Sequence, residues 1–162
     1  IMKSMIDRFW KKIPPEMINK AGEKGLSPHQ LVTFASLVGK EAANSQEKPL
    51  IAAVFHNRLK KKMPLQSDPT AVYDLEGFNG KILRRHYLRE SPYNTYLIRG
   101  LPPGPISNPG LDSFRAVIDP ERTDCLYFVA RGDGTHIFTA TLDEHNKAVA
   151  SVRDFSKNGP KD

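Results

Sequence analysis

A stretch of the chain from residue 61 to residue 109 is broken so often by proline and glycine that it cannot form a long helix or strand. Its turn signals lie at residues 63–64, 68–69, 77, 79–80, 91–92 and 101–105. Irregular segments of this length are uncommon inside a compact domain, and where they occur they are usually functional. The sequence therefore predicts a domain in which regular elements frame a long, turn-rich segment.

Helical patterns precede the turn-rich segment, with apolar residues at helical spacing in residues 2–13, 16–20, 28–43 and 49–60. The clearest start signal is a capping box, in which Ser27 is followed three residues later by Gln30. Pro28 stands in the first turn, where its missing N–H costs nothing. The third of these helices is therefore the most firmly predicted element.

The residues after the turn-rich segment combine helices with a β-hairpin. A short helix is predicted at residues 111–118, strands at 126–130 and 135–139, and a last helix from 142 to about 155. A glycine-rich turn at 131–134 joins the strands, and Thr141 with Glu144 forms a second capping box. The predicted fold class is α+β, helix-rich, with a small antiparallel β-sheet and a long turn-rich segment.

The length of 162 residues is that of one domain with a sizeable core. We expect residues 27–155 to form this domain, residues 1–26 to be a linker from an upstream region, and residues 156–162 to be a frayed tail. Ile1 is not an initiator methionine, so we expect the chain to be a piece of a longer protein. The sequence contains no run of 18 apolar residues and no signal-peptide pattern.

The net charge of +6 favours an anionic partner: nucleic acid, an acidic membrane surface or an acidic cell-wall polymer. Basic residues cluster at 11–12, 60–62 and 84–85, although each cluster alone is typical of a solvated helix end. Nucleic acid is disfavoured, because these residues are not interleaved with aromatic side chains and match no docking motif. The single Cys125 cannot form an internal disulfide, and we expect it to be a buried thiol in a strand.

Two charged residues lie within or beside apolar helix stripes. Glu41 projects from the border of the stripe that contains Phe34 and Val38. Arg58 falls within the apolar stripe of the next helix, where it needs a carboxylate or carbonyl partner because an unpaired buried charge is costly. Glu41 and Asp68 are the candidate partners.

The turn-rich segment and the helix before it are dense in side chains that can hydrogen-bond hydroxyl and acetamido groups. A fold does not need this density of Asn, Gln, Asp and Tyr between rigid turns, whereas a cleft for a hydroxyl-rich polymer does. Each of these residues alone is more often structural than ligand-binding. Together they form the candidate binding set: Asn57, Arg58, Gln66, Ser67, Asp68, Tyr93, Asn94 and Thr95. His136 and His145 are expected to be packed or exposed side chains outside this set.

A series of segments resembles the YceG/MltG-like family of endolytic murein transglycosylases, which was long misnamed after aminodeoxychorismate lyase. The resemblance runs from about Ser27 to Val152. The segments are ASLVGKE at 35–41, VFHNRL at 54–59, MPLQSDPT at 63–70, YNTY at 93–96, GLPPGP at 100–105, YFV at 127–129 and TLDEHN at 141–146. Several consecutive motifs in the same order argue against a chance match.

The resemblance implies cleavage of the β-1,4 bond between N-acetylmuramic acid and N-acetylglucosamine within glycan strands, which leaves a 1,6-anhydro end. It implies peptidoglycan as the partner, with the cell-wall elongation machinery as a further candidate. It also implies an N-terminal anchor in the inner membrane, absent from this sequence, and a catalytic domain on the periplasmic or extracytoplasmic side. Residues 1–26 would then be the end of a LysM-like region.

This chain departs from the family at Gly39, where family members often carry a first glutamate, as Glu-Lys-Glu or Glu-Arg-Glu. Position 39 lies about 160° around the helix from Glu41, on the other side of the apolar stripe. We therefore assign the catalytic acid to Glu41. Gly39 lowers helix propensity by roughly 1 kcal/mol, which close packing would explain.

Glycosidic cleavage needs a proton for the departing oxygen, so the pKa of Glu41 must rise by roughly two pH units. The apolar side chains of Phe34 and Val38 would raise it by disfavouring the carboxylate. The muramyl 6-hydroxyl then attacks within the same molecule, and the same carboxylate can accept its proton. An arginine on Glu41 would lower that pKa, so we expect Arg58 to pair with Asp68.

The sequence also leaves two other functions open. The missing first glutamate favours a non-catalytic peptidoglycan-binding module, which would bind sacculi without cleaving them. The historical name corresponds to a pyridoxal-phosphate-dependent lyase, which needs a buried lysine, whereas Lys40 and residues 60–62 are expected to be solvated. We expect no cofactor and no metal, because no Gly-rich phosphate loop, Cys-His spacing or His-Glu-x-x-His motif is present.

Overall fold

The computed structural model describes residues 2–158, and the remainder of the predicted tail, residues 159–162, lies outside the described residues. The helices are α1 Met2–Lys12, α2 Pro15–Glu23, α3 Pro28–Glu41, α4 Lys48–Lys60, α5 Arg84–Tyr87, α6 Leu111–Ile118 and α7 Leu142–Asn158, with 3₁₀ turns η1 Ser45–Glu47 and η2 Asp68–Ala71. The strands are β1 Tyr127–Ala130 and β2 His136–Thr139. The predicted α+β class is confirmed, and α7 continues to Asn158 rather than ending near Phe155.

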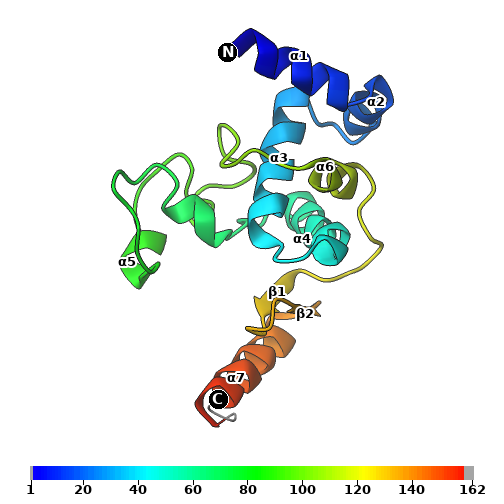
Figure 1. Cartoon of the computed structure of the whole chain (residues 1–162). Helices are drawn as coiled ribbons and strands as arrows, with labels where there is room; N and C mark the ends of the chain where they lie inside the picture. The colour runs from blue at the N-terminus through cyan, green and yellow to red at the C-terminus, as the bar shows by residue number, and fades with distance from the viewer. Residues whose placement is uncertain (1, 159–162) are drawn as a thin grey trace.

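Helix α3 runs through the middle of the fold, with α4 and α6 beside it (Figure 1). The predicted capping box begins it: Gln30 N–H donates to Ser27 Oγ at 3.2 Å, and Ser27 N–H donates to Gln30 Oε1 at 2.9 Å. Most of its side chains between residues 31 and 38 are buried. Phe34 packs toward Phe55 of α4, with ring centroids 6.3 Å apart. Burial of this apolar stripe fixes α3, and with it the position of Glu41.

The N-terminal helices pack on the same core. Ile13, Met17 and Ala21 are buried in one cluster with the apolar residues of α3 and α6. The boundary predicted at residue 26 therefore does not coincide with a break in the core.

The β-hairpin lies below the helical body, with α7 packed against it (Figure 1). The strands are antiparallel, with Tyr127 opposite Thr139 and Ala130 opposite His136. Phe128 of β1 packs on Phe55 of α4, with ring centroids 5.8 Å apart, so the hairpin is joined to the core through an aromatic contact. Cys125 is partly buried and precedes β1, so the prediction that it lies in a strand was wrong.

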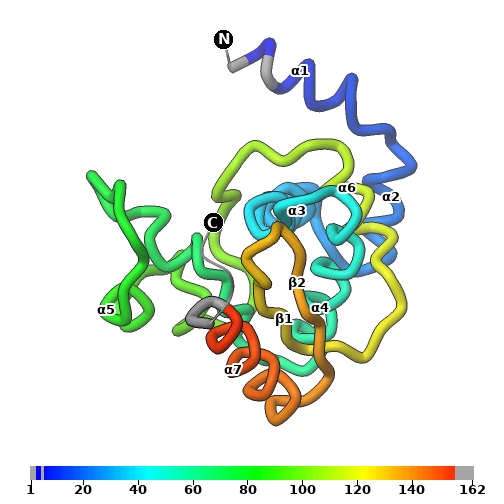
Figure 2. Tube along the Cα trace, turned by 60° about the horizontal axis from the view of Figure 1, so that its bottom comes forward, coloured from blue at the N-terminus to red at the C-terminus, as the bar shows by residue number. Residues whose placement is uncertain are grey.

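The turn-rich segment folds back along α3 and contains only short helical turns, η2 and α5, among its described residues. Figure 2, viewed toward the lower end of Figure 1, shows the α5 loop and α7 on two sides of the hairpin and the end of α3. The loop is tied to α3, because Ile106 N–H donates to Ser36 Oγ at 3.0 Å and Ser107 Oγ donates to Ser36 O at 3.1 Å. These two bonds fasten the turn-rich segment to α3.

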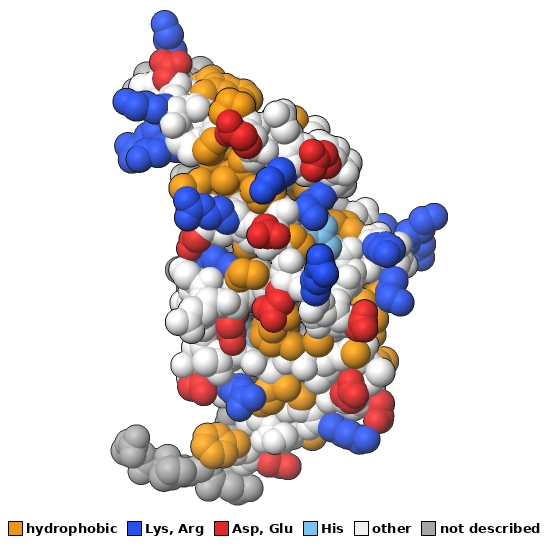
Figure 3. Space-filling model, turned by 90° about the vertical axis from the view of Figure 1, so that its right-hand side faces the viewer, with side chains coloured by type: hydrophobic (Ala, Val, Ile, Leu, Met, Phe, Trp, Pro, Cys, Tyr) orange, Lys and Arg blue, Asp and Glu red, His pale blue; other side chains and the backbone are white. Residues whose placement is uncertain are grey.

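The surface carries mixed charge. On the face shown in Figure 3, Lys and Arg side chains gather toward the end formed by α1, and acidic and basic side chains are interspersed over the rest. Within residues 2–158, no helix combines the length and the apolar composition that crossing a bilayer requires.

Gly39 lies where α3 meets α6. A Cβ atom built at Gly39 would be 3.1 Å from Ser113 Oγ, and Ser113 is fully buried. The glycine therefore allows a close approach of the two helices, as its low helix propensity indicated. Position 39 faces α6, and Glu41 points away from that contact.

We expect Gly39→Leu to destabilise the protein by about 1–3 kcal/mol, because added side-chain volume must push α6 away from α3. The matched control is Lys40→Leu, one residue on and exposed, which should change stability by less than about 0.5 kcal/mol. Urea unfolding followed by circular dichroism measures both. Equal stability of the two variants would contradict the close packing at Gly39.

Candidate active site

A cavity of about 550 Å³ lies beside the C-terminal end of α3. Glu41 contributes from α3, Gln66 and Asp68 from the turn-rich segment, and Phe128 and His136 from the hairpin. Arg58 of α4, Tyr87, Tyr96 and one face of α7 also line it. The cavity therefore draws together segments that are far apart in the sequence.

Glu41 is the last residue of α3, and its carboxyl group accepts a hydrogen bond from Ser67 Oγ. Burial raises the pKa of Glu41 to about 7; the hydrogen bond from Ser67 opposes this rise and the nearby negative charge of Asp68 adds to it. The end of a helix also carries partial negative charge, which disfavours a carboxylate. The predicted rise of the Glu41 pKa is therefore present, and the carboxyl group can hold a proton at neutral pH.

Ser67 is held by a small network of buried hydroxyl groups. Its backbone N–H donates to Thr95 Oγ1 at 2.9 Å, and its carbonyl accepts a hydrogen bond from Thr70 Oγ1 at 2.6 Å. The Thr70 and Thr95 hydroxyl oxygens are themselves 2.8 Å apart and share a hydrogen bond. All three residues are at most 1% exposed. This network fixes the side chain that holds the Glu41 carboxyl group.

Asp68 stands beside this network and is exposed at the cavity. It accepts hydrogen bonds from the hydroxyl groups of Tyr96 and, at 3.2 Å, Tyr87. The two tyrosine rings lie 4.5 Å apart between centroids. Burial and the Asp68 carboxylate raise the pKa of both tyrosines, so both hydroxyl groups stay protonated as donors.

Arg58 does not pair with Asp68, so that prediction was wrong. Its Nε donates to Leu126 O at 2.6 Å, and its Nη1 donates to Pro64 O at 3.0 Å and Leu65 O at 3.1 Å. A guanidinium group carries five N–H donors, and here backbone carbonyls accept from Nε and Nη1 without a carboxylate. Arg58 still lines the cavity, where its Nη1 also donates to Gln66 Oε1 at 3.1 Å.

Gln66 adopts an unusual backbone conformation, with a φ of 53°. Non-glycine residues in this left-handed region are uncommon and cluster at functional sites. The Gln66 backbone is held by a bond from its N–H to Thr95 O at 3.0 Å. Of the predicted binding set, Arg58, Gln66, Ser67 and Asp68 thus surround Glu41.

The other predicted binding residues lie outside the cavity lining. Asn57 donates to Thr123 O at 2.8 Å and to Cys125 O at 3.0 Å, so its amide holds the segment that leads into β1. Asn94 is fully buried, and its amide donates to Arg89 O at 2.7 Å within the turn-rich segment. For these residues the structure corrects the prediction of direct binding, because loop carbonyls occupy their donors.

Tyr93 and Thr95 also have structural contacts rather than cavity contacts. The Tyr93 ring packs on Tyr73, with centroids 4.8 Å apart, and its hydroxyl group lies close to Gly104. Thr95 is fully buried in the hydroxyl network that holds Ser67. Both therefore shape the loops next to the cavity.

Sequence reasoning missed Tyr87, His136 and His145, which all line the cavity. The sequence gives no signal that separates the two histidines from ordinary packed or exposed side chains. Their placement depends on the hairpin and α7 folding back toward the end of α3, which no local pattern encodes. The capping box of Thr141 and Glu144 marked the start of α7 but not its direction.

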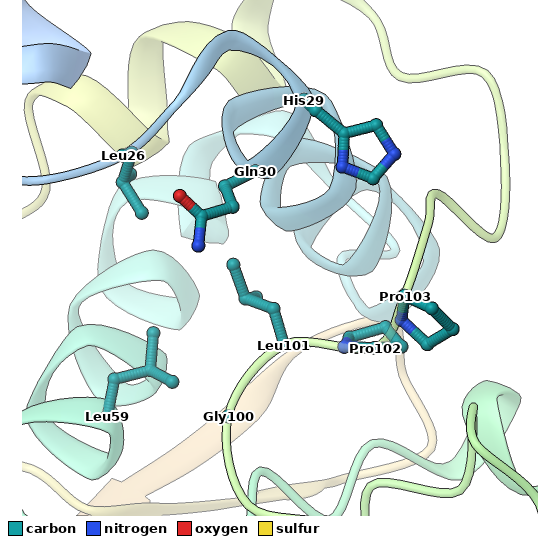
Figure 4. A pocket seen from close by; sticks show the side chains of 8 residues that line it. All are labelled: Leu26, His29, Gln30, Leu59, Gly100, Leu101, Pro102 and Pro103. Carbon is teal, nitrogen blue, oxygen red and sulfur yellow. The ribbon is translucent and has the colours of Figure 1, made fainter.

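A second cavity of about 420 Å³ lies at the opposite end of α3. Figure 4 shows His29 and Gln30 of α3, Leu59 of α4 and the loop at residues 100–103 around it. Position 29 is about 18 Å from position 41 along the helix axis. This cavity is therefore separate from the Glu41 cavity.

Comparison with known protein families gives a match over most of this chain. The model of the YceG-like family matches residues 1–151. The chain belongs to the YceG-like family. A solved YceG-like protein from Listeria monocytogenes has a TM-score of 0.75 and 42% sequence identity, over 82% of this chain and 43% of that one.

Curated relatives of this YceG-like chain are named endolytic murein transglycosylases. The one from Bacillus subtilis (strain 168) is 50% identical over 123 residues, which are 76% of this chain and 34% of that protein. The one from Streptococcus pneumoniae serotype 2 is 39% identical in an alignment of 137 positions that covers 78% of this chain and 24% of that protein. The YceG-like chain thus spans between about a quarter and a third of the length of these relatives.

Two single substitutions should move the pKa of Glu41 in opposite directions. Ser67→Ala should raise it, because the lost hydrogen bond stabilised the carboxylate. Asp68→Asn should lower it, because a neighbouring negative charge is removed. NMR titration of the Glu41 side-chain carboxyl carbon measures both. Shifts of the same sign in the two variants would contradict the described environment.

Glu41→Gln should stabilise the protein at alkaline pH. The folded-state pKa of about 7 lies above the ordinary value of 4.5 for a glutamate, so the stability of the wild-type protein falls as pH rises through this window and stays reduced above it. At pH 8 we expect a gain of about 1–3 kcal/mol in the free energy of unfolding, with little change at pH 4. Urea titrations at the two pH values measure this difference.

Glu144→Gln is the control of opposite sign. Hydrogen bonds from Thr141 and Ala140 lower the pKa of Glu144. Replacing this carboxylate by an amide should therefore reduce the free energy of unfolding at pH 8. A Glu41→Gln variant that is no more stable than wild type at pH 8 would show that the carboxyl group is solvated.

Proposed function

We propose that this chain is the catalytic domain of an endolytic murein transglycosylase, with Glu41 as the general acid. The observation that carries the proposal is a carboxyl group with a pKa of about 7 in a cavity lined by polar and aromatic side chains. The names of the curated relatives from Bacillus subtilis and Streptococcus pneumoniae support the same reaction. The proposed substrate is the glycan strand of peptidoglycan.

The first step is proton transfer from Glu41 to the departing glycosidic oxygen. A group with a pKa of about 7 is about half protonated at neutral pH, which suits a general acid. As the bond to the anomeric carbon breaks, positive charge develops on the sugar ring. The carboxylate of Asp68, exposed at the same cavity, stabilises this charge electrostatically.

The second step is closure of the sugar upon itself. The 6-hydroxyl of the muramyl residue attacks the anomeric carbon, which forms the 1,6-anhydro ring and releases the hydroxyl proton to a base in the cavity. One carbon–oxygen bond breaks and another forms, and no water is consumed. The reaction therefore needs one acid, one proton acceptor and a cavity that holds the muramyl sugar in place.

The residues that line the cavity are the ones to which we assign roles in binding the glycan. Gln66 and Asp68 offer hydrogen-bonding groups to sugar hydroxyl and acetamido groups. Tyr87 and Tyr96 offer aromatic surface for a sugar ring. Arg58 supports this wall, because most of its donors are already bonded to backbone carbonyls.

We further propose an extracytoplasmic location, since peptidoglycan lies outside the cytoplasmic membrane. As the family resemblance implies, we propose that the full protein is attached to that membrane outside residues 1–162. The cell-wall elongation machinery is the proposed partner. Co-purification of the full-length protein with cell-wall synthases from detergent-solubilised membranes would test the last point.

Digestion of purified sacculi tests the reaction and the acid together. Wild-type protein should release internal fragments with 1,6-anhydro-muramyl ends, detected by mass spectrometry. Glu41→Gln should reduce the rate by at least about 10²–10⁴-fold, because the amide cannot donate the proton. The matched control is Glu23→Gln, an exposed glutamate at the end of α2, which should leave the rate unchanged.

Two outcomes would contradict the proposal. Full activity of Glu41→Gln would remove this residue from the reaction. Binding of sacculi by the wild-type protein without any cleavage would favour the non-catalytic binding module instead.

A further inference from the structure

The cavity that holds Glu41 also holds an imidazole backed by a carboxylate. His136 lies on β2 and Glu47 on η1, and His136 Nδ1 is 2.7 Å from Glu47 Oε2. The other oxygen of this carboxylate accepts a hydrogen bond from the His136 backbone N–H at 3.0 Å. The His136 side chain is 8% exposed and lines the cavity, whereas Glu47 stands behind it.

The second ring nitrogen of His136, Nε2, has no hydrogen-bond partner among the described residues. It is not one of the fully buried side-chain atoms that lack a partner, so it keeps some exposure to solvent. A carboxylate can only accept a hydrogen bond, so Nδ1 is the donor to Glu47, and a neutral ring in this tautomer carries its lone pair on Nε2. In that form His136 has a proton acceptor in the cavity that Glu41 also lines.

Neighbouring groups hold this pair in place. Asn44 Oδ1 accepts a hydrogen bond from Glu47 N–H at 3.0 Å, and Asn44 Nδ2 donates to Gly134 O at 2.9 Å, which ties the hairpin turn to η1. Phe128 packs edge-on against the imidazole, with centroids 5.4 Å apart. Burial alone would raise the pKa of Glu47, but hydrogen bonds from His136 and Asn44 lower it, so a charged carboxylate backs the ring.

We propose that His136 is a second proton-transfer residue of this cavity, with Glu47 as its positioning residue. In this scheme Nε2 of His136 accepts the proton of the attacking 6-hydroxyl, while Glu41 delivers a proton to the departing oxygen. The proposal rests on the transglycosylase function and identifies its proton acceptor.

The step balances in atoms and charge. The Glu41 proton moves to the glycosidic oxygen as the bond from that oxygen to C1 breaks, the bond from C1 to O6 forms, and the 6-hydroxyl proton moves to Nε2. The cavity is left with a carboxylate and an imidazolium, whose opposite charges stabilise each other. Glu47 stabilises the imidazolium from behind. His136 then releases a proton to water, and Glu41 takes one up.

The surroundings of the two groups differ in a way that suits these tasks. Burial and the charge of Asp68 favour the protonated form of Glu41, whereas the contact with Glu47 orients the imidazole of His136. A histidine that served only as a tether for the hairpin would need Nδ1 but not an open Nε2.

His136→Asn separates proton transfer from tethering. The asparagine amide can replace Nδ1 as the donor to Glu47, but no atom replaces Nε2. We expect kcat on sacculi to fall by about 10²–10³-fold with little change in KM and in the thermal midpoint. Asp133→Ala is the matched control, because it removes the hydrogen bonds from Thr135 that hold the hairpin turn and leaves the contacts of Glu47 and His136 unchanged. It should retain nearly full activity.

Glu47→Gln tests the positioning role. The amide group would donate to Nδ1, so the proton of the neutral ring would move to Nε2 and block it as an acceptor. We expect kcat to fall as in His136→Asn while KM stays near its wild-type value. Nitrogen-15 NMR of the imidazole should show the change of tautomer directly.

A substrate with an activated leaving group distinguishes the two proton transfers. In a 4-nitrophenyl β-glycoside of the GlcNAc–MurNAc disaccharide, the nitrophenolate departs without a proton. Glu41→Gln should recover most of its lost rate on this substrate. His136→Asn should stay slow on it, because the 6-hydroxyl must still lose a proton.

Each outcome decides the proposal. Wild-type rates for His136→Asn on both substrates would refute the role of His136 and leave the transglycosylase function intact. Loss of activity in Asp133→Ala as large as in His136→Asn would show that the pair only holds the hairpin in place. Glu41→Gln that stays inactive on the aryl glycoside, with His136→Asn active, would assign both transfers to Glu41. Failure of the wild-type protein to form anhydro ends would refute the proposed function itself.

Discussion

The buried guanidinium group of Arg58 is the contact on which the cavity depends. The residue is 7% exposed, and its donors reach the turn after α4, the side chain of Gln66 and the carbonyl of Leu126 just before β1. One side chain of α4 thus holds the turn-rich segment and the hairpin together, and these two segments supply facing parts of the cavity wall.

Among the described residues, this cation has no carboxylate partner. Backbone carbonyls compensate its desolvation, and the ring of Tyr127 lies 5.0 Å from the guanidinium carbon. A lysine could not replace it, because an ammonium group lacks the planar fork that reaches several carbonyls at once. The absence of a carboxylate on Arg58 also leaves Asp68 free to act on the cavity through its own charge.

Local elements were predictable, because their signals lie a few residues apart. The capping box at Ser27 and the bounds of α6 at Leu111–Ile118 agree with the sequence patterns, and so does the placement of Glu41 at the border of a buried stripe. The binding set was only partly predictable. An irregular segment leaves many backbone groups without secondary-structure partners, and its polar side chains fill that need. Asn94 is such a residue, and a list of polar side chains cannot separate it from Gln66, which lines the cavity.

The contact between Gly39 and Ser113 has a mechanical consequence for Glu41. A helix that rests backbone to side chain against its neighbour cannot roll about its own long axis. Glu41 lies two residues after Gly39 on the same helix, so the contact that prevents rotation of α3 also fixes the direction of the Glu41 carboxyl group. A larger side chain on α6 at this contact would therefore rotate α3 and displace the Glu41 carboxyl group, without altering any atom that a sugar touches.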